Sequence, residues 1–276
     1  MLRKLKLAAA RRVNFTVRKQ LNGTRYKLPI LGGIGARMRQ DYEPWMVQTL
    51  IDLERSTTGC LVDVGMNLGQ TLLAMKSVRT DWEYYGFEPN PACVYYVHQL
   101  IEANDLDRCT VYPFGIGGTT GVVDLRTNTV SGGEGSIVEG ILPDSWFGRT
   151  VKVPIMAADA LPSELVDQRW GVLKVDVEDA ELEVFRTLTP FIERDQPQIV
   201  TELLPTYGAE GGMALRLERQ TAVIELLQDL GYQMFRIHLD GSREALTHVD
   251  DHRQITWSNY LFVPTEVKSM ATSPRS

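Results

Sequence analysis

One segment constrains the fold of this chain more than any other: residues 60–71 read CLVDVGMNLGQT. Its apolar start, Leu61 to Val64, passes into small residues at Gly65, Asn67 and Gly69 and then into residues that favour a helix. This order predicts a buried parallel strand, a tight turn and the start of a helix. In α/β proteins such a turn lies where the sheet binds nucleotide-like ligands. We therefore predict an α/β protein whose ligand site begins at this turn.

A second predicted strand, Trp82 to Phe87, ends in an acid, Glu88, nineteen residues after Gly69. A Rossmann unit places the carboxylate that binds ribose hydroxyls at about this distance from its turn. A later glycine-rich bend, Phe114 to Gly118, also follows a strand and is expected to lie along an adenine ring. The residues predicted to bind the cofactor are Asp63, Gly65, Asn67, Gly69, Glu88, Pro89, Gly115 and Ile116.

The turn departs from the dinucleotide fingerprint G-x-G-x-x-G, because Asp63 stands where the first glycine is expected. That glycine lets the backbone approach a pyrophosphate, which a carboxylate would repel. An acid suits a ligand that carries an ammonium group beside a ribose, and S-adenosylmethionine has both groups. Asp63 and Asn67 are therefore expected near the aminoacyl end of that ligand. The structural alternative is an ordinary turn between strand and helix with no ligand.

Strand-like and helix-like segments alternate from about residue 60 to 264, so we predict one domain over residues 41–264. The last two strand-like runs, 232–239 and 257–264, are close in sequence and are expected to pair as an antiparallel hairpin. A mostly parallel sheet closed by such a hairpin is usual in S-adenosylmethionine-dependent methyltransferases, whereas dinucleotide oxidoreductases continue with parallel strands. Helices are predicted over residues 41–55, from Gln70, from Pro91 and over residues 215–230.

A glycine-rich stretch, residues 127–150, separates two short predicted strands, 122–126 and 151–155. Loops of this length inside a compact domain are uncommon and are usually functional or disordered. We predict that this stretch is a substrate lid. Trp146 is expected to offer its ring to a sugar.

Four charged residues are predicted to carry the chemistry. Alternation along a predicted strand, residues 171–177, places Lys174, Asp176 and Glu178 on one face. Charges on one face of a central strand are costly unless they are paired or used. Glu202 ends the neighbouring strand, so all four are expected beside the reacting group at the carboxyl edge of the sheet. The alternative is a salt-bridge network that only stabilises this edge.

Two mechanisms are open for these residues. In one, a carboxylate or Lys174 takes the proton from an acceptor hydroxyl. In the other, Asp176, Glu178 and Glu202 hold a divalent cation that lowers the pKa of that hydroxyl. The sequence does not choose between them.

Charge is unevenly distributed along the chain. Residues 1–40 hold eleven of the 29 Lys and Arg residues and none of the 35 Asp and Glu residues. This basic N-terminal arm is expected to be a solvated helical extension, and the alternatives are contact with anionic lipid, a phosphorylated substrate or a neighbouring subunit. The acidic remainder offers no basic groove for nucleic acid.

No apolar run approaches the about 20 residues that span a bilayer. The apolar segment from Leu5 to Ala10 is too short for a signal peptide, so a cytoplasmic protein is expected. Residues 265–276 are expected to be a flexible tail. The three cysteines have no close pair, which fits neither a disulfide framework nor a zinc site.

Five motifs occur in the order and spacing of FkbM-type methyltransferases: DVGMNLGQ (63–70), FEPNP (87–91), FGIG (114–117), KVDVEDAE (174–181) and TELLP (201–205). The chain resembles this family over roughly residues 41–264. The resemblance implies a Rossmann-like class I methyltransferase fold, S-adenosylmethionine as donor and O-methylation. The acceptors that it implies are sugars of polysaccharides or lipid-linked glycans and polyketide hydroxyls. Asp179 stands where the family usually has glycine.

Two other functions remain open at this point. An NAD(P)-dependent Rossmann oxidoreductase shares the turn and the ribose-binding acid, but Asp63 and the closing hairpin disfavour it. A non-catalytic module would keep the cofactor site without turnover, and the set of Lys174, Asp176, Glu178 and Glu202 argues against it.

Overall fold

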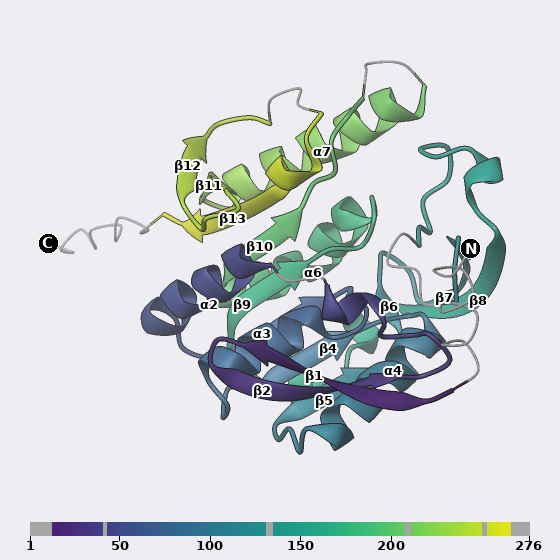
Figure 1. The fold of residues 1–276 in the computed structure, drawn as a ribbon. Helices are drawn as coiled ribbons and strands as arrows, with labels where there is room; N and C mark the ends of the chain where they lie inside the picture. Colours follow the sequence, from purple (N-terminus) through teal and green to yellow (C-terminus); the bar gives the residue numbers. More distant parts are fainter. Residues whose placement is uncertain (1–12, 41–42, 131–134, 208–210, 250–252, 266–276) are drawn as a thin grey trace, which may run out of the picture.

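The computed structural model describes residues 13–40, 43–130, 135–207, 211–249 and 253–265 (Figure 1). Within them the main sheet has eight strands, in the order β12-β11-β13-β10-β9-β3-β4-β5. These strands are β3 (Cys60–Val64), β4 (Tyr84–Phe87), β5 (Cys109–Tyr112), β9 (Trp170–Val175), β10 (Gln198–Glu202), β11 (Tyr232–Ile237), β12 (Arg243–Leu246) and β13 (Asn259–Pro264). The predicted α/β class is confirmed.

The strands from β10 to β5 in this order are parallel, and β13 lies antiparallel between β10 and β11. The predicted antiparallel pairing of the last two long strands is therefore confirmed, and β12 adds an edge strand beside β11. Strands β3 and β9 are neighbours although more than 100 residues separate them, because the chain leaves β3 in one direction and returns on its other side. A sheet of this kind binds ligands at the carboxyl end of that switch point.

Helices cover both faces of the sheet. Helices α2 (Pro44–Ser56), α3 (Gln70–Val78) and α4 (Pro91–Ala103) pack in one apolar cluster, and α5 (Ser163–Val166), α6 (Glu181–Asp195) and α7 (Gly212–Asp229) pack in the other. Strand alternation separates the clusters: Leu61 belongs to the first and Val62 to the second. The predicted starts at Gln70 and Pro91 are confirmed, since Gly69 and Asn90 occupy the cap positions before them.

The described part of the N-terminal arm is not a helical extension. It forms a hairpin of β1 (Phe15–Leu21) and β2 (Thr24–Ile30), joined at Asn22 and Gly23, which both have positive φ. An Asn-Gly pair with this backbone is the favoured two-residue hairpin turn. Every second residue of β2 is apolar, and Tyr26 and Leu28 pack into the same cluster as α3 and α4. The expectation of a solvated helix is wrong for these residues, and residues 1–12 lie outside the described part.

A second sheet lies beside the main one (Figure 1) and contains β6 (Gly115–Ile116), β7 (Gly121–Thr127) and β8 (Arg149–Met156). Strands β7 and β8 pair antiparallel, which agrees with the two short strands predicted there. The glycine-rich stretch between them is held at several points. Arg126 pairs with Ser136 in a backbone bridge, and its guanidinium binds the carboxylate of Asp144 at 2.9 Å. Residues 131–134 lie outside the described part.

The cysteines, the possibility of a membrane span and the C-terminal tail were also considered in the sequence. The cysteines Cys60, Cys93 and Cys109 are free thiols. Among the described helices, none has the length and apolar character needed to cross a membrane. Of the predicted tail, only Thr265 is described, and its backbone N–H donates to Gly231 O at 2.8 Å.

The hairpin packing predicts that Leu28 stabilises the whole domain. Leu28 is fully buried, so Leu28→Ala should lower the free energy of unfolding by about 2–5 kcal/mol in urea titrations. Lys27→Ala, at the exposed neighbouring position, should change it by less than about 0.5 kcal/mol. Equal effects of the two substitutions would mean that the hairpin does not fold with the domain.

Candidate active site

Two cavities meet at the carboxyl edge of the sheet. Counting their open mouths, the first has about 720 Å³ and the second about 520 Å³. Gly65, Asn67 and Asp176 line both. Because they share these residues, a ligand that crosses the turn after β3 can reach into both cavities.

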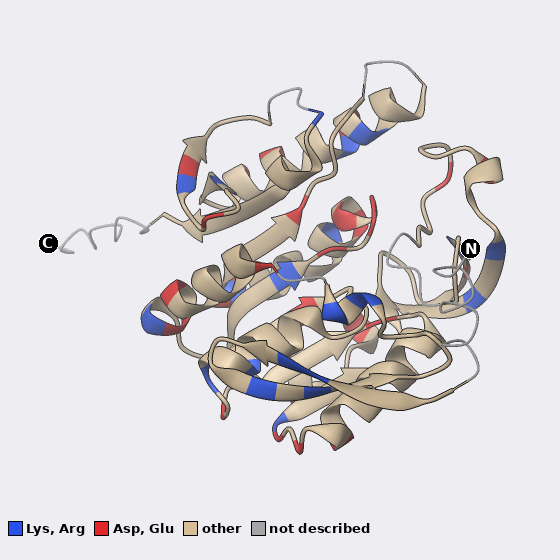
Figure 2. Cartoon of the chain, in the orientation of Figure 1, with Lys and Arg blue, Asp and Glu red and all other residues tan. Residues whose placement is uncertain are grey.

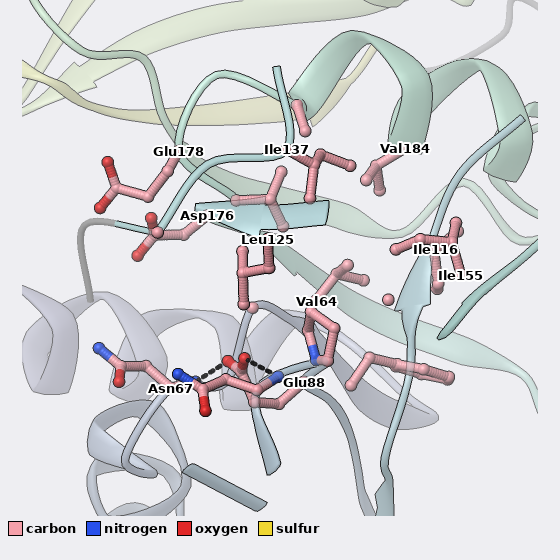
Figure 3. A pocket seen from close by; sticks show the side chains of 18 residues that line it. Val64, Asn67, Glu88, Ile116, Leu125, Ile137, Ile155, Asp176, Glu178 and Val184 are labelled. Carbon is pink, nitrogen blue, oxygen red and sulfur yellow. Dashed lines mark hydrogen bonds between the residues drawn. The ribbon is translucent and has the colours of Figure 1, made fainter. Parts of the chain in front are cut away.

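The first cavity has a polar side and an apolar side (Figure 3). Asn67, Asp176 and Glu178 lie together on the polar side, and Glu88 lies at its base. The apolar side is formed by Ile116, Leu125, Ile137, Ile155 and Val184. Apart from Ile116 these apolar residues were not predicted to line the site. Leu125 and Ile155 come from the second sheet, where the only sequence signal is the alternation of apolar residues in β7 and β8, and Ile137 comes from the glycine-rich stretch.

The turn after β3 has the close geometry that its glycines indicate. Gly65 has a φ of +83°, and a Cβ at this position would lie 1.8 Å from the backbone oxygen of Asp176. No other residue fits there, and the two strand ends are therefore in direct backbone contact. Gly69 lies further on, as the cap of α3, and faces Leu100 rather than either cavity. Gly69 therefore lines neither cavity, and its predicted role in cofactor binding stays a prediction.

Glu88 is held by the backbone of two segments. Its carboxylate accepts hydrogen bonds from the N–H groups of Asn67 at 3.0 Å and Asn90 at 2.8 Å. The residue is only 8% exposed, and burial raises the pKa of Glu88 to about 7. Pro89, Gly115 and Ile116 line the same cavity. The structure therefore brings these four predicted residues together with Gly65 and Asn67.

Asp63 occupies a different position from the one predicted. Its carboxylate is completely buried and lines neither cavity. The hydroxyl of Tyr84 donates to it at 2.7 Å, and Lys174 Nζ lies 3.2 Å from its other oxygen. Asp63 and Lys174 are direct neighbours in the register of β3 and β9. Strand alternation explains why Asp63 does not reach the cavities. Its side chain projects from the same face of β3 as that of Leu61, which packs against α2, α3 and α4.

Lys174 connects this buried layer to the turn. Its ammonium donates to Gly65 O at 3.0 Å and lies 3.3 Å from the carboxylate of Asp176. Burial alone would lower the pKa of Lys174, but the negative charges of Asp176 and Asp63 outweigh burial and raise this pKa above its usual value. Lys174 is therefore a fixed cation that supports the site, which disfavours its predicted use as a general base.

The second cavity is lined by side chains of α2, which precedes β3, of α3, which follows the turn, and of the strand ends. Trp45 and Met46 come from α2, and Gln70 and Thr71 come from α3. The strand ends contribute Lys174, Asp176, Val200, Thr201, Glu202 and Asn259. Glu43 also lines it. This cavity is more polar than the first and contains three of the four residues predicted to be catalytic.

Glu178 is positioned by a turn, not by strand alternation. Strand β9 ends at Val175, two residues earlier than predicted, and Glu178 and Asp179 follow with φ angles of +54° and +81°. These left-handed angles are strained for residues other than glycine. They turn the Glu178 side chain into the first cavity, while Glu202 lines the second.

The two glutamates have raised pKa values. Burial, with the charge of Asp176 as the next cause, raises the pKa of Glu202 to about 9. Burial also raises the pKa of Glu178 well above its usual value, and Asp176 and Glu202 add to this shift. The site thus contains carboxyl groups that hold protons more tightly than exposed glutamates do. Strongly shifted carboxyl groups in a cleft are typical of acid–base sites.

The predicted cation ligands do not form a metal site in this conformation. Within the residues that the structure covers, no group of three or more His, Cys, Asp or Glu side chains has a geometry that could hold a metal ion. Asp176, Glu178 and Glu202 divide between the two cavities, and only Asp176 lines both.

Comparison with known proteins identifies the family. The family model of the methyltransferase FkbM domain matches residues 63–234. A curated relative, methyltransferase sdnD of Sordaria araneosa, is 25% identical over 220 residues, which cover 70% of this chain and 81% of the relative. The chain belongs to the FkbM methyltransferase family, and it is an S-adenosylmethionine-dependent methyltransferase. This family does not favour the oxidoreductase alternative.

Solved structures of methyltransferases are also similar to this chain, at low sequence identity. The FkbM methyltransferase of Methylobacillus flagellatus is 15% identical, with a TM-score of 0.44, and the match covers 74% of this chain but 43% of that one. The tRNA (uracil-54, C5)-methyltransferase of Pyrococcus abyssi, solved with S-adenosyl-L-homocysteine, is 10% identical with a TM-score of 0.41, and the match covers 90% of this chain and 43% of that one. This chain therefore spans less than half the length of these two proteins.

The raised pKa of Glu88 predicts a pH dependence of cofactor affinity. A ribose hydroxyl donates best to the ionised carboxylate, so affinity should fall as pH decreases through about 7. Calorimetry with S-adenosylhomocysteine should show roughly tenfold weaker binding at pH 6 than at pH 8. Glu88→Gln should remove this dependence and weaken binding at pH 8 by about ten- to a hundredfold. Equal affinity of the wild type at both pH values would remove Glu88 from the ribose site.

Proposed function

We propose that this enzyme transfers a methyl group from S-adenosylmethionine to a hydroxyl of a sugar, a polysaccharide or a related secondary metabolite. The observation that carries the proposal is the pair of half-buried glutamates, Glu178 and Glu202, beside Asp176 where the two cavities meet. A hydroxyl must lose its proton during methylation, and a buried carboxylate with a raised pKa is a strong base once it is ionised.

The side chains of the first cavity fit the nucleoside half of the cofactor. Its apolar side matches an adenine ring, and Glu88 at its base matches ribose hydroxyls. The aminoacyl half then extends over Gly65 and Asn67 into the second cavity, where Gln70 and Thr71 begin α3. Asp63 acts from below, through Lys174, instead of touching the ammonium group. When bound, S-adenosylmethionine supplies an electrophilic methyl group on a positively charged sulfur.

Asp176, Glu178 and Glu202 have two roles in this proposal: one carboxylate takes the acceptor's proton, and Asp176 places negative charge near the cofactor. Asp176 lines both cavities and is half-exposed, so its negative charge lies where a positively charged ligand would cross the turn. A positive charge nearby favours the ionised forms of Glu178 and Glu202. One of these two then accepts the hydroxyl proton. Alignment of acceptor and donor contributes more to the rate than this proton transfer does.

The polar second cavity supports a sugar as the acceptor. Trp45, which is largely buried, is the aromatic residue that lines it, and Glu202 and Asn259 line it from the sheet edge. Sugars are held by such a combination of an aromatic face and polar groups. Trp146, predicted for this role, is 51% exposed and lines neither cavity. Its contact with an acceptor therefore remains a prediction for a closed form.

The glycine-rich stretch is proposed as the lid of the site. Gly135 and Ile137 line the first cavity, and the hydroxyl of Ser136 donates to the backbone oxygen of Glu178 at 2.8 Å. Movement of this stretch would therefore open the first cavity and change the support of Glu178. Closure would exclude water and hold both substrates.

Location and membrane contact are further proposals. The outer face of the N-terminal hairpin exposes Arg18, Arg25 and Lys27, and Arg18 and Lys27 are cross-strand neighbours (Figure 2). The chain as a whole has a net charge of −6. We propose a cytoplasmic enzyme that uses this basic face for peripheral contact with anionic membranes.

The choice of a hydroxyl acceptor is tested with S-adenosylmethionine that carries a tritiated methyl group. The panel should include methyl glycosides, nucleotide sugars and polyketide alcohols, with matched amino sugars and thiols as controls. We expect label in a hydroxyl compound, in an ether that resists mild alkali. Label only in the amine or thiol controls would contradict O-methylation, and cofactor binding without label in any compound would favour a non-catalytic module.

Substitution of the carboxylates separates chemistry from cofactor binding. Asp176→Asn and Glu202→Gln should keep the dissociation constant of S-adenosylhomocysteine within about threefold but lower turnover by about a hundredfold or more, because these groups act mainly on the transition state. The same reaction after exhaustive EDTA treatment tests the cation mechanism. Full activity in EDTA leaves direct base catalysis, whereas activity lost in EDTA and restored by Mg²⁺ or Mn²⁺ supports a cation. Unchanged turnover of Glu202→Gln would remove Glu202 from the mechanism.

A further inference from the structure

Asp179, next to the proposed catalytic Glu178, does not face either cavity. Its side chain is 7% exposed and accepts two hydrogen bonds from Arg216 on α7, at 2.6 Å from Nε and 2.7 Å from Nη2. Arg216 itself is 4% exposed. A buried carboxylate and guanidinium in this two-point geometry form one of the strongest and most directional contacts between side chains.

Arg216 also reaches the segment that carries the other glutamate. Its Nη1 donates to the backbone oxygen of Pro205 at 3.0 Å, three residues after Glu202. From the next turn of α7, Gln220 donates to Leu204 O at 2.6 Å. One side chain thus joins the turn that presents Glu178 to the loop that follows Glu202.

The ion pair also explains how a residue other than glycine occupies position 179. Its φ of +81° follows the φ of +54° at Glu178, and strain of this kind persists only where the surroundings hold it. Arg216 holds the Asp179 carboxylate, and Arg219 donates to the Asp179 backbone oxygen from both Nε and Nη2. Helix α7 therefore fixes the backbone of the turn as well as its side chain.

We propose that Arg216 is a positioning residue that sets the separation of the Glu178 and Glu202 carboxyl groups through its ion pair with Asp179. This inference rests on the proposed function, in which those two carboxyls face the acceptor. The charged groups around Glu178 are Asp176, Glu202, Glu181 and Asp179. A change in the position of the turn alters how close Glu178 lies to the first two of these, and therefore alters its titration.

Arg216→Lys is the informative substitution, because it keeps the buried charge but not the two-point contact or the bond to Pro205. We would follow the titration of glutamates labelled with ¹³C at the side-chain carboxyl by NMR, with Glu178→Gln and Glu202→Gln to assign the two signals. In Arg216→Lys the midpoints of Glu178 and Glu202 should both move down by about half a pH unit or more, because the loosened turn admits water. The midpoint of Glu88 should stay in place.

A matched control and a rescue complete the experiment. Arg186→Lys replaces an exposed arginine of α6 and should leave both midpoints within about 0.2 units. Asp179→Gly combined with Arg216→Met leaves no unpaired buried charge and keeps a residue suited to a positive φ, so it should fold even where Arg216→Met alone does not. Its midpoints should be shifted as in Arg216→Lys.

Unchanged midpoints of Glu178 and Glu202 in Arg216→Lys would overturn the proposal, and so would an equal shift of Glu88, which would indicate a general loss of structure. These outcomes do not depend on turnover. If Glu178→Gln and Glu202→Gln both turn over at the wild-type rate, the proposed function fails while the positional result stands. Where an acceptor is found, a kcat effect of Arg216→Lys that disappears in the Glu178→Gln background supports positioning, and independent effects contradict it.

Discussion

The buried ion pair between Lys174 and Asp63 determines the geometry of the rest of the site. Two opposite charges that neighbouring strands bury at the same level are stable only together, since either one alone would carry a large desolvation cost. The same ammonium binds the backbone oxygen of Gly65 and lies beside Asp176. The turn after β3 and the first acid after β9 are therefore fixed relative to each other from below. Asp176 lines both cavities and Asp63 lines neither, so the negative charge exposed beside this turn is that of Asp176.

Around this centre the acidic groups differ in which neighbouring groups oppose or add to the effect of burial on their pKa values. Glu88 is buried but accepts two backbone hydrogen bonds, which favour its ionised form and limit the rise of its pKa to about 7. Glu202 lies near Asp176 and Glu181, and its pKa rises to about 9. Two glutamates at the same edge of the sheet, one after β4 and one at the end of β10, thus suit different tasks. In the proposed mechanism the first holds a neutral hydroxyl group of the cofactor, and the second exchanges a proton with the acceptor.

Much of the fold could be predicted because its signals are local. The glycines of the turn, the acid at position 88 and the start of α4 at Pro91 all follow from short-range backbone and strand rules. The N-terminal hairpin also has local signals, namely the Asn22-Gly23 turn and the alternation of Tyr26 and Leu28. The many basic residues of this segment favoured a solvated helix instead. The apolar wall of the first cavity could not be predicted, because it depends on how a separate sheet packs against the main one. The left-handed turn at Glu178 was missed for a similar reason, since a partner on α7 holds it.

The contacts of α7 show what a site rich in carboxylates requires from the surrounding protein. Repulsion among Asp176, Glu178 and Glu202 favours their separation, and two consecutive strained residues add to the tendency of this turn to relax. Neither effect can be offset within residues 176–180 themselves, because no basic side chain lies among them. The compensation comes from outside the turn: Lys174 from below, the hydroxyl of Ser136 from the glycine-rich stretch and Arg216 from α7. The arrangement of the carboxylates is therefore a property of three separate segments, and a change in any one of them acts on the same few atoms.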